Sequence, residues 1–211
     1  MSFAIAACFK DYAIIAADTR STTSYPNGER KHDDGYKKIA CIPNTNIVTY
    51  STGVNMFAGK NFEQIASEIT ADNAIAVCLE FASHIKPTLC GNDKTYVTAV
   101  EYRGNTLFLA ECDITSSTFN INQTAIDPSK MGEGGWRSFY SGPDWARNLT
   151  ASVDFTGYIV SQREAIVALR NYIKGLILIS PLMKESRGAI GGNVDMVLLK
   201  PESAPEFLTF L

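Results

Sequence analysis

The chain has 211 residues, 45% of them hydrophobic, with 19 basic and 22 acidic side chains for a net charge of −3. This length and apolar content can form one core, so we expect a single domain over residues 1–211. The near balance of charge gives no basic surface for nucleic acid. Five scattered cysteines without a C-x-x-C pair argue against a disulfide framework or a structural zinc site.

The N-terminal residues and the lengths of the apolar segments bear on the cellular location of the protein. Residues 2–9 are apolar, but no basic segment precedes them, so no signal peptide is predicted. The other apolar segments look too short to cross a bilayer. We therefore expect a cytoplasmic protein without a membrane partner.

Two short apolar runs, residues 2–9 and 12–20, flank a polar pair. This pattern predicts a β-hairpin. With the turn centred on the polar pair, cross-strand partners have residue numbers that sum to about 21, or about one less if the turn is looser. Ser2 is then expected to lie beside Asp18 or Thr19.

The remaining elements follow from apolar periodicity and turn signals. They are a loop at 21–29, strands at 36–42 and 47–51, a helix at 54–70, a helix after an Asp72 N-cap, strands at 95–103, 106–113, 118–123 and 136–141, helices at 144–153 and 162–183, and strands at 194–199 and 207–211. Runs of strands separated by helix pairs, without βαβ alternation, indicate an α+β layered sandwich.

Ser2 is the first candidate for chemistry. It is small, so Met1 is expected to be removed by methionine aminopeptidase. The new first residue would then carry both a hydroxyl nucleophile and an α-amine with a pKa of about 7.7–8.0. Such an amine can accept the hydroxyl proton at neutral pH.

Asp18 ends an apolar strand, where an unpaired carboxylate would be costly. It either pairs with Arg20 or caps a turn, or it orients a lysine near Ser2. Alternation along the strand at 36–42 places Lys37 on the core side, while Lys38 looks the other way. Lys37 is therefore the predicted partner, since an inward lysine is rare unless paired.

Two strand ends carry further candidates. Thr52 and Gly53 are expected to join a strand to a helix N-terminus, where free N–H groups can form an oxyanion hole. The alternative is an ordinary glycine turn. Ser141 begins a strand-to-helix corner, where its hydroxyl either bonds an N-terminal amine or caps the helix.

Metal and cofactor chemistry finds little support in the sequence. His32 and His84 are too few and too far apart for a zinc site or a Ser-His-Asp triad. The glycines at 132, 134 and 135 precede a strand, so they do not form a phosphate loop. No cofactor and no metal are predicted.

Several stretches together resemble the proteasome β-subunit family of N-terminal nucleophile (Ntn) hydrolases. They are Ser2, Ala16–Arg20, Tyr36–Ile39, Ser51–Gly53, Tyr140–Gly142 and Gly191–Val194. The resemblance implies a four-layer αββα sandwich of two antiparallel sheets flanked by helix pairs. It also implies peptide or protein substrates, a homo-oligomeric ring, and an ATP-dependent unfoldase as a candidate partner.

The resemblance also implies roles for individual residues. They are nucleophile for Ser2, orienting carboxylate for Asp18, catalytic lysine for Lys37, oxyanion donor for Gly53 with Thr52 as the alternative register, and support of the amine for Ser141. Many members of that family carry Asp-x-x-Ser before the Gly-Gly, where this chain has Arg187 and Ile190.

Three functions remain open at this point. The first is a peptidase that uses Ser2 as its nucleophile. The second is a non-catalytic structural subunit, favoured by Arg187 and Ile190. The third is an amidase or transpeptidase that acts on a small substrate.

Overall fold

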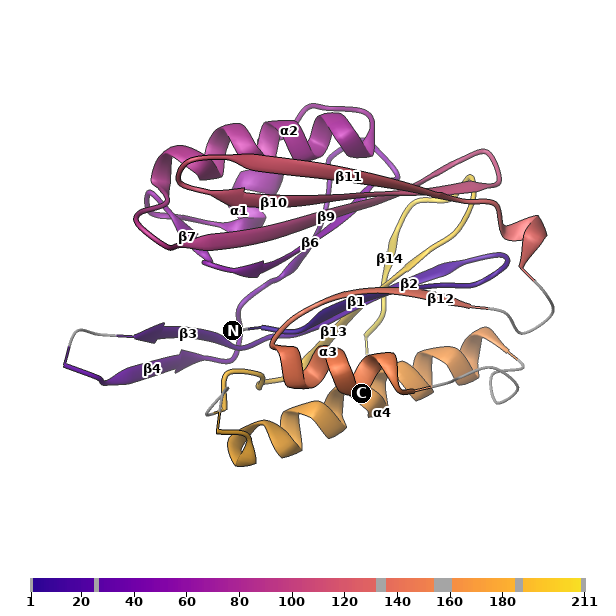
Figure 1. Ribbon diagram of the computed structural model, residues 1–211. Coiled ribbons are helices and arrows are strands. Elements are labelled where there is room, and N and C mark those ends of the chain that lie inside the picture. The colour runs from indigo at the N-terminus through magenta and orange to yellow at the C-terminus, as the bar shows by residue number, and fades with distance from the viewer. Residues whose placement is uncertain (1, 25–26, 132–135, 154–160, 185–187, 210–211) are drawn as a thin grey trace.

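The computed structural model describes residues 2–24, 27–131, 136–153, 161–184 and 188–209. Met1, Arg187 and the glycines at 132, 134 and 135 lie outside these ranges. The described chain is α+β, with two five-stranded antiparallel sheets and helices on their outer faces (Figure 1).

The first sheet holds the N-terminal hairpin. Its order is β12 (Arg137–Ser141), β1 (Ala4–Cys8), β2 (Ala13–Asp18), β13 (Val194–Leu199) and β14 (Glu206–Phe207). Ala4 pairs with Ala17 and Cys8 with Ala13. The predicted hairpin and its register are therefore confirmed.

The second sheet has the order β11 (Phe119–Ile126), β10 (Thr106–Thr115), β9 (Lys94–Arg103), β6 (Val48–Gly53) and β5 (Ile39–Cys41). Its strands alternate between two apolar clusters. In β10, Leu107 and Leu109 face the first sheet, whereas Ala110 and Cys112 face the helices. This period of two buries both faces of the sheet.

Helices cover the outer face of each sheet. α1 (Phe62–Ala66) and α2 (Ala74–Ile85) pack on the second sheet, and α3 (Asp144–Ala151) and α4 (Gln162–Ile179) pack on the first (Figure 1). Short 3₁₀ turns occupy Lys86–Thr88, Pro128–Lys130 and Ser180–Leu182. The apolar cluster that contains Leu107 and Leu109 fills the space between the two sheets.

The predicted helix at 54–70 is wrong over its first half. That segment forms a small hairpin of β7 (Met56–Phe57) and β8 (Lys60–Asn61), and only α1 is helical. Ala58 and Gly59 turn the chain with positive φ angles of 50° and 85°, which a helix cannot contain. Asn61 then caps α1. The second helix is likewise capped by Asn73 and not by Asp72.

The predicted loop at 21–29 is also wrong over its first four residues. β3 (Ser21–Ser24) and β4 (Arg30–Asp33) form a two-stranded ribbon that projects beside the N-terminus (Figure 1). β4 is exposed along its whole length. It therefore lacks the apolar alternation by which a strand is recognised in sequence.

The expectation that no apolar segment is long enough to cross a bilayer is wrong for helix α4. With the turn that follows it, Gln162–Leu182 is long and apolar enough to cross a membrane by composition alone, with a mean hydropathy of 1.4. In the structure, Leu169, Ile173 and Leu176 are buried against the first sheet. Of that stretch, 28% is buried, and a single helix of this kind is weak evidence for a membrane span.

The packing of α4 gives a matched pair of mutations. Leu169→Ala should lower the free energy of unfolding by about 2–5 kcal/mol because it leaves a cavity against the sheet. Leu178→Ala should change it by less than about 0.5 kcal/mol, since Leu178 is 76% exposed. Urea unfolding of both variants checks the orientation of the helix, and equal losses would contradict it.

Candidate active site

Asp18 is a fully buried carboxylate at the end of β2, with no exposed surface. Its Oδ1 accepts hydrogen bonds from Phe3 N at 2.8 Å and Lys38 Nζ at 2.7 Å. Its Oδ2 accepts from Arg20 N at 3.2 Å and Gly191 N at 3.0 Å. These four donors replace the water that a buried carboxylate loses.

The bond from Phe3 N fixes the position of Ser2. Asp18 N also donates to Phe3 O at 3.2 Å, so the chain is held on both sides of Phe3. Ser2 is only 4% exposed and lines a cavity at this end of the sheets. This placement agrees with the prediction that Ser2 lies beside Asp18 or Thr19, because Phe3, the residue that follows Ser2, is bonded to Asp18.

Lys38 is the lysine that meets Asp18. Its side chain is 2% exposed, and the ion pair joins two buried groups. Burial lowers the pKa of Lys38 from its ordinary value, and the nearby Asp18 carboxylate offsets part of that shift. A buried lysine of lowered pKa gives up its proton more readily than one in water.

The prediction that Lys37 faces the core is wrong. Its ammonium is 47% exposed and forms an ion pair with Asp195 at 3.0 Å. The reason is that β5 begins only at Ile39, so both lysines precede the regular strand. Side-chain alternation does not extend through them, and Lys38 turns inward instead.

A glycine loop after α4 completes the surroundings of Asp18, and sequence reasoning gave it no role in the site. A Cβ at Gly191 would lie 2.3 Å from the Arg20 guanidinium, so any larger residue there would displace that side chain. That guanidinium forms an ion pair with Asp34 and donates to Gly188 O at 3.0 Å. The Arg20 side chain therefore does not pair with Asp18, and only its backbone N–H reaches the carboxylate.

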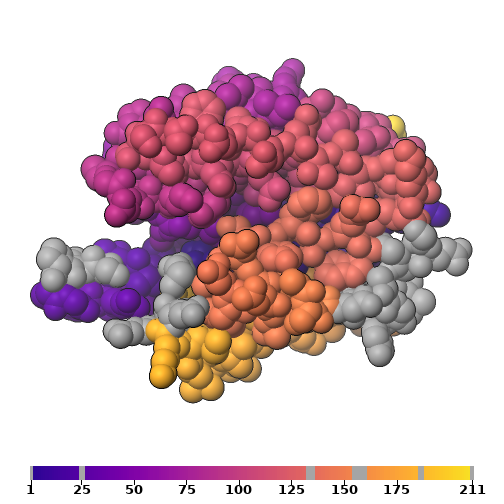
Figure 2. Space-filling model, viewed as in Figure 1, coloured from indigo at the N-terminus to yellow at the C-terminus, as the bar shows by residue number. Residues whose placement is uncertain are grey.

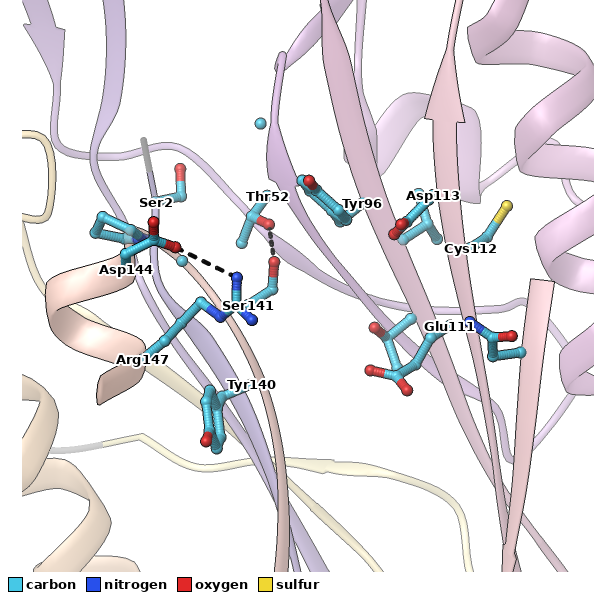
Figure 3. A pocket seen from close by; sticks show the side chains of 16 residues that line it. Ser2, Thr52, Tyr96, Glu111, Cys112, Asp113, Tyr140, Ser141, Asp144 and Arg147 are labelled. Carbon is cyan, nitrogen blue, oxygen red and sulfur yellow. Dashed lines mark hydrogen bonds and ion pairs between the residues drawn. The ribbon is translucent and has the colours of Figure 1, made fainter. Parts of the chain in front are cut away.

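Ser141 lies at the end of β12 and bonds to the Thr52 hydroxyl on β6 (Figure 3). This bond joins the two sheets beside the N-terminus. A Cβ at the next residue, Gly142, would lie 2.9 Å from Phe3 and 3.1 Å from Ser2 O. Glycine at 142 thus lets β12 approach the start of the chain.

Gly53 lines the same cavity but does not begin a helix. It ends β6 with φ of 103°, and a Cβ there would lie 2.3 Å from Lys94 O. Close approach of β9 thus explains the glycine without any reference to chemistry. The expected helix N-terminus at this position is wrong, and α1 starts nine residues later at Phe62.

The cavity beside Ser2 has a volume of about 600 Å³. It opens at the end of the sheets from which the β3–β4 ribbon projects, where the surface is hollowed (Figure 2). Ser2, Thr52 and Ser141 lie on one side of it, and the side chains of β9 and β10 lie across from them (Figure 3).

Two further residues bear on the site. Ile190 is fully buried in the apolar cluster under α4, and its N–H donates to Ser180 Oγ at 3.1 Å. It cannot supply the hydroxyl found there in many proteasome subunits, and Arg187 lies outside the described residues. The described ranges contain no cluster of three His, Cys, Asp or Glu side chains placed to bind a metal.

Comparison with solved structures gives near full-length matches. Two of the matched structures are of Anbu from Hyphomicrobium sp. strain MC1. The Gly-1 mutant matches with a TM-score of 0.58 and 13% identity, over 99% of this chain and 88% of that one. The second Anbu structure matches with a TM-score of 0.57 and 13% identity, over 98% of this chain and 87% of that one. No family model and no curated protein matches the sequence.

These matches correct the sequence-based family assignment. Anbu is a different, though related, family of Ntn type, so the assignment to the proteasome β-subunit family is wrong. At 13% identity the likeness is one of fold. The α+β architecture with antiparallel sheets is compatible with an Ntn-like fold.

The two neighbouring lysines provide a direct test of the site. Lys38→Met should lower the free energy of unfolding by about 3–5 kcal/mol, because it leaves the Asp18 carboxylate buried without a cation. Lys37→Met should cost less than about 1 kcal/mol, since its ion pair is exposed. Urea unfolding at pH 7 measures both, and a larger loss for Lys37→Met would contradict the assignment.

Proposed function

We propose that this chain is an N-terminal nucleophile hydrolase that cleaves peptide or other amide bonds with Ser2 after removal of Met1. The observation that carries the proposal is the Asp18 carboxylate, which bonds Phe3 N and Lys38 Nζ through one oxygen. Phe3 N and Lys38 Nζ thus meet at one carboxylate oxygen, and Ser2, the residue before Phe3, lines the cavity.

The proposed reaction begins with the free amine of Ser2, which takes the hydroxyl proton directly or through water. The Ser2 oxygen attacks the substrate carbonyl carbon, and the carbonyl electrons move onto its oxygen. The N–H of Gly53 is the proposed donor to this oxyanion. Collapse expels the leaving amine, which takes the proton, and water then hydrolyses the acyl-enzyme ester.

Lys38 takes the role that the sequence assigned to Lys37. A positive charge beside the Ser2 hydroxyl favours the alkoxide and keeps the neighbouring amine neutral. Asp18 holds that charge in place through its 2.7 Å bond. Ser141 bonds Thr52 in the structure, so its proposed part is to join the sheets next to the nucleophile.

Wider features of the protein belong to the same proposal. They are a single domain over 1–211, a four-layer αββα sandwich, a cytoplasmic location, and a homo-oligomeric ring that an ATP-dependent unfoldase could feed. The likeness to Anbu supports the fold part of this proposal.

A non-catalytic subunit is the second candidate. Two observations favour it: Ile190 is buried where a hydroxyl would stand, and the Ser141 hydroxyl is engaged by Thr52. Both reduce the number of groups available to hold the N-terminal amine.

Covalent labelling separates the two candidates. Protein that begins at Ser2, released from a cleavable fusion, should gain the mass of one peptide epoxyketone, because such a probe bonds both a hydroxyl and an adjacent α-amine. Intact mass with peptide mapping should place the adduct on Ser2. Ser2→Ala, which keeps the amine but loses the hydroxyl, should not be labelled.

Protein that retains Met1 is the matched control, since its sequence is otherwise identical and its Ser2 nitrogen is an amide. It should also remain unlabelled. If protein shown to begin at Ser2 stays unmodified while its circular dichroism matches that of the Met1 form, the chain is a non-catalytic subunit.

A further inference from the structure

The face of the second sheet that looks toward the first changes character along its strands. At one end it is apolar, with Leu107, Leu109 and Val100 in the cluster between the sheets. The same face of β10 continues with Glu111 and then Asp113, because side chains two apart share a face. The gap between the sheets therefore becomes acidic toward the end where Ser2 lies.

Neighbouring strands extend this polar end of the face. Glu111 is paired with Thr98 on β9 and with Asn122 on β11, while Asp113 is paired with Tyr96. All of them line the cavity that Ser2 also lines. Figure 3 shows both carboxylates directed into the space across from Ser2 and α3.

Neither carboxylate has a cation partner among the described residues. The cation on the cavity wall, Arg147, lies 3.4 Å from Asp144 on the same helix. Lys94 is not among the residues that line the cavity, and it donates to the Tyr96 hydroxyl at 3.3 Å; its charge attracts that of Asp113 without forming an ion pair with it. The wall formed by β10 thus presents negative charge that the described chain does not neutralise by an ion pair.

Partial burial of the Glu111 carboxylate makes its negative charge costly, which favours a bound cation. Desolvation, and secondarily the charge of Asp113, raise the pKa of Glu111 above its ordinary value. Desolvation and the charge of Asp113 both make the ionised form of Glu111 less stable in this wall. A bound cation would reduce that cost, and a bound anion would increase it.

We propose that Glu111 and Asp113 select substrates that carry a cationic side chain, lysine or arginine, close to the bond that Ser2 attacks. The proposal rests on the proposed function, because it concerns the same cavity. A guanidinium or ammonium that enters the cavity meets two carboxylates on one strand, with the Thr98 and Asn122 side chains beside them to complete its hydrogen bonds. The preference would exclude acidic substrates by the same charges.

Tripeptide epoxyketones test this without requiring turnover. A series carries Arg, Leu or Glu at each position in turn on an alanine background, and intact mass gives the rate of adduct formation on protein that begins at Ser2. Arg at one position or more should react about tenfold faster than Leu, and Glu should react more slowly than Leu. Glu111→Gln and Glu111→Gln/Asp113→Asn should reduce the ratio of Arg to Leu rates to within about threefold.

Glu206→Gln is the matched control, because it removes an exposed acid on β14 that does not line the cavity. It should keep the full Arg-over-Leu ratio. The series on unchanged protein remains informative if a variant fails to fold. Adducts on Ser2 without any preference for Arg would overturn this inference and leave the proposed function standing. A lack of adducts with every probe would overturn the proposed function, and this inference with it.

Discussion

The buried ion pair of Asp18 and Lys38 is the interaction on which the rest of the site depends. Three segments far apart in sequence converge on this carboxylate at the end of β2: the N-terminus, the segment before β5 and the glycine loop at 191. Arg20 N, just after β2, supplies the fourth bond. A carboxylate with all its acceptor positions used makes a rigid anchor. The start of the chain, ordinarily the loosest part of a protein, is held in place by it.

The hairpin and its register could be predicted because local sequence determines them. Two apolar runs around a short polar turn restrict the pairing to a register centred on that turn or shifted by about one residue, and the structure has the first of these. The choice between Lys37 and Lys38 could not be predicted, because it depends on where β5 begins. Long-range contacts decide it: Lys38 O accepts from Ser51 N on β6 at 3.0 Å, while the Lys38 side chain reaches Asp18 on the other sheet. The error at Asp72 likewise concerns an element boundary, whereas at 54–61 a hairpin stands where a helix was expected.

The space between the sheets serves two purposes along its length. Where the sheets lie close, apolar side chains fill it and hold the layers together. Toward Ser2 the same faces carry hydroxyls and carboxylates, and the Thr52–Ser141 bond joins the sheets where apolar packing ends. The sequence signal for this change was present in β10, where Leu107 and Leu109 give way to Glu111 and Asp113. It could not be interpreted before the strand was placed opposite the N-terminus.

The central claim is that the working protein begins at Ser2, with a free amine beside the Asp18–Lys38 pair. N-terminal sequencing of the protein purified from its own cells tests this most directly. We expect serine as the first residue in essentially all of the folded material. Methionine retained at the first position of that material would contradict it, because the amine that should accept the hydroxyl proton would then belong to another residue.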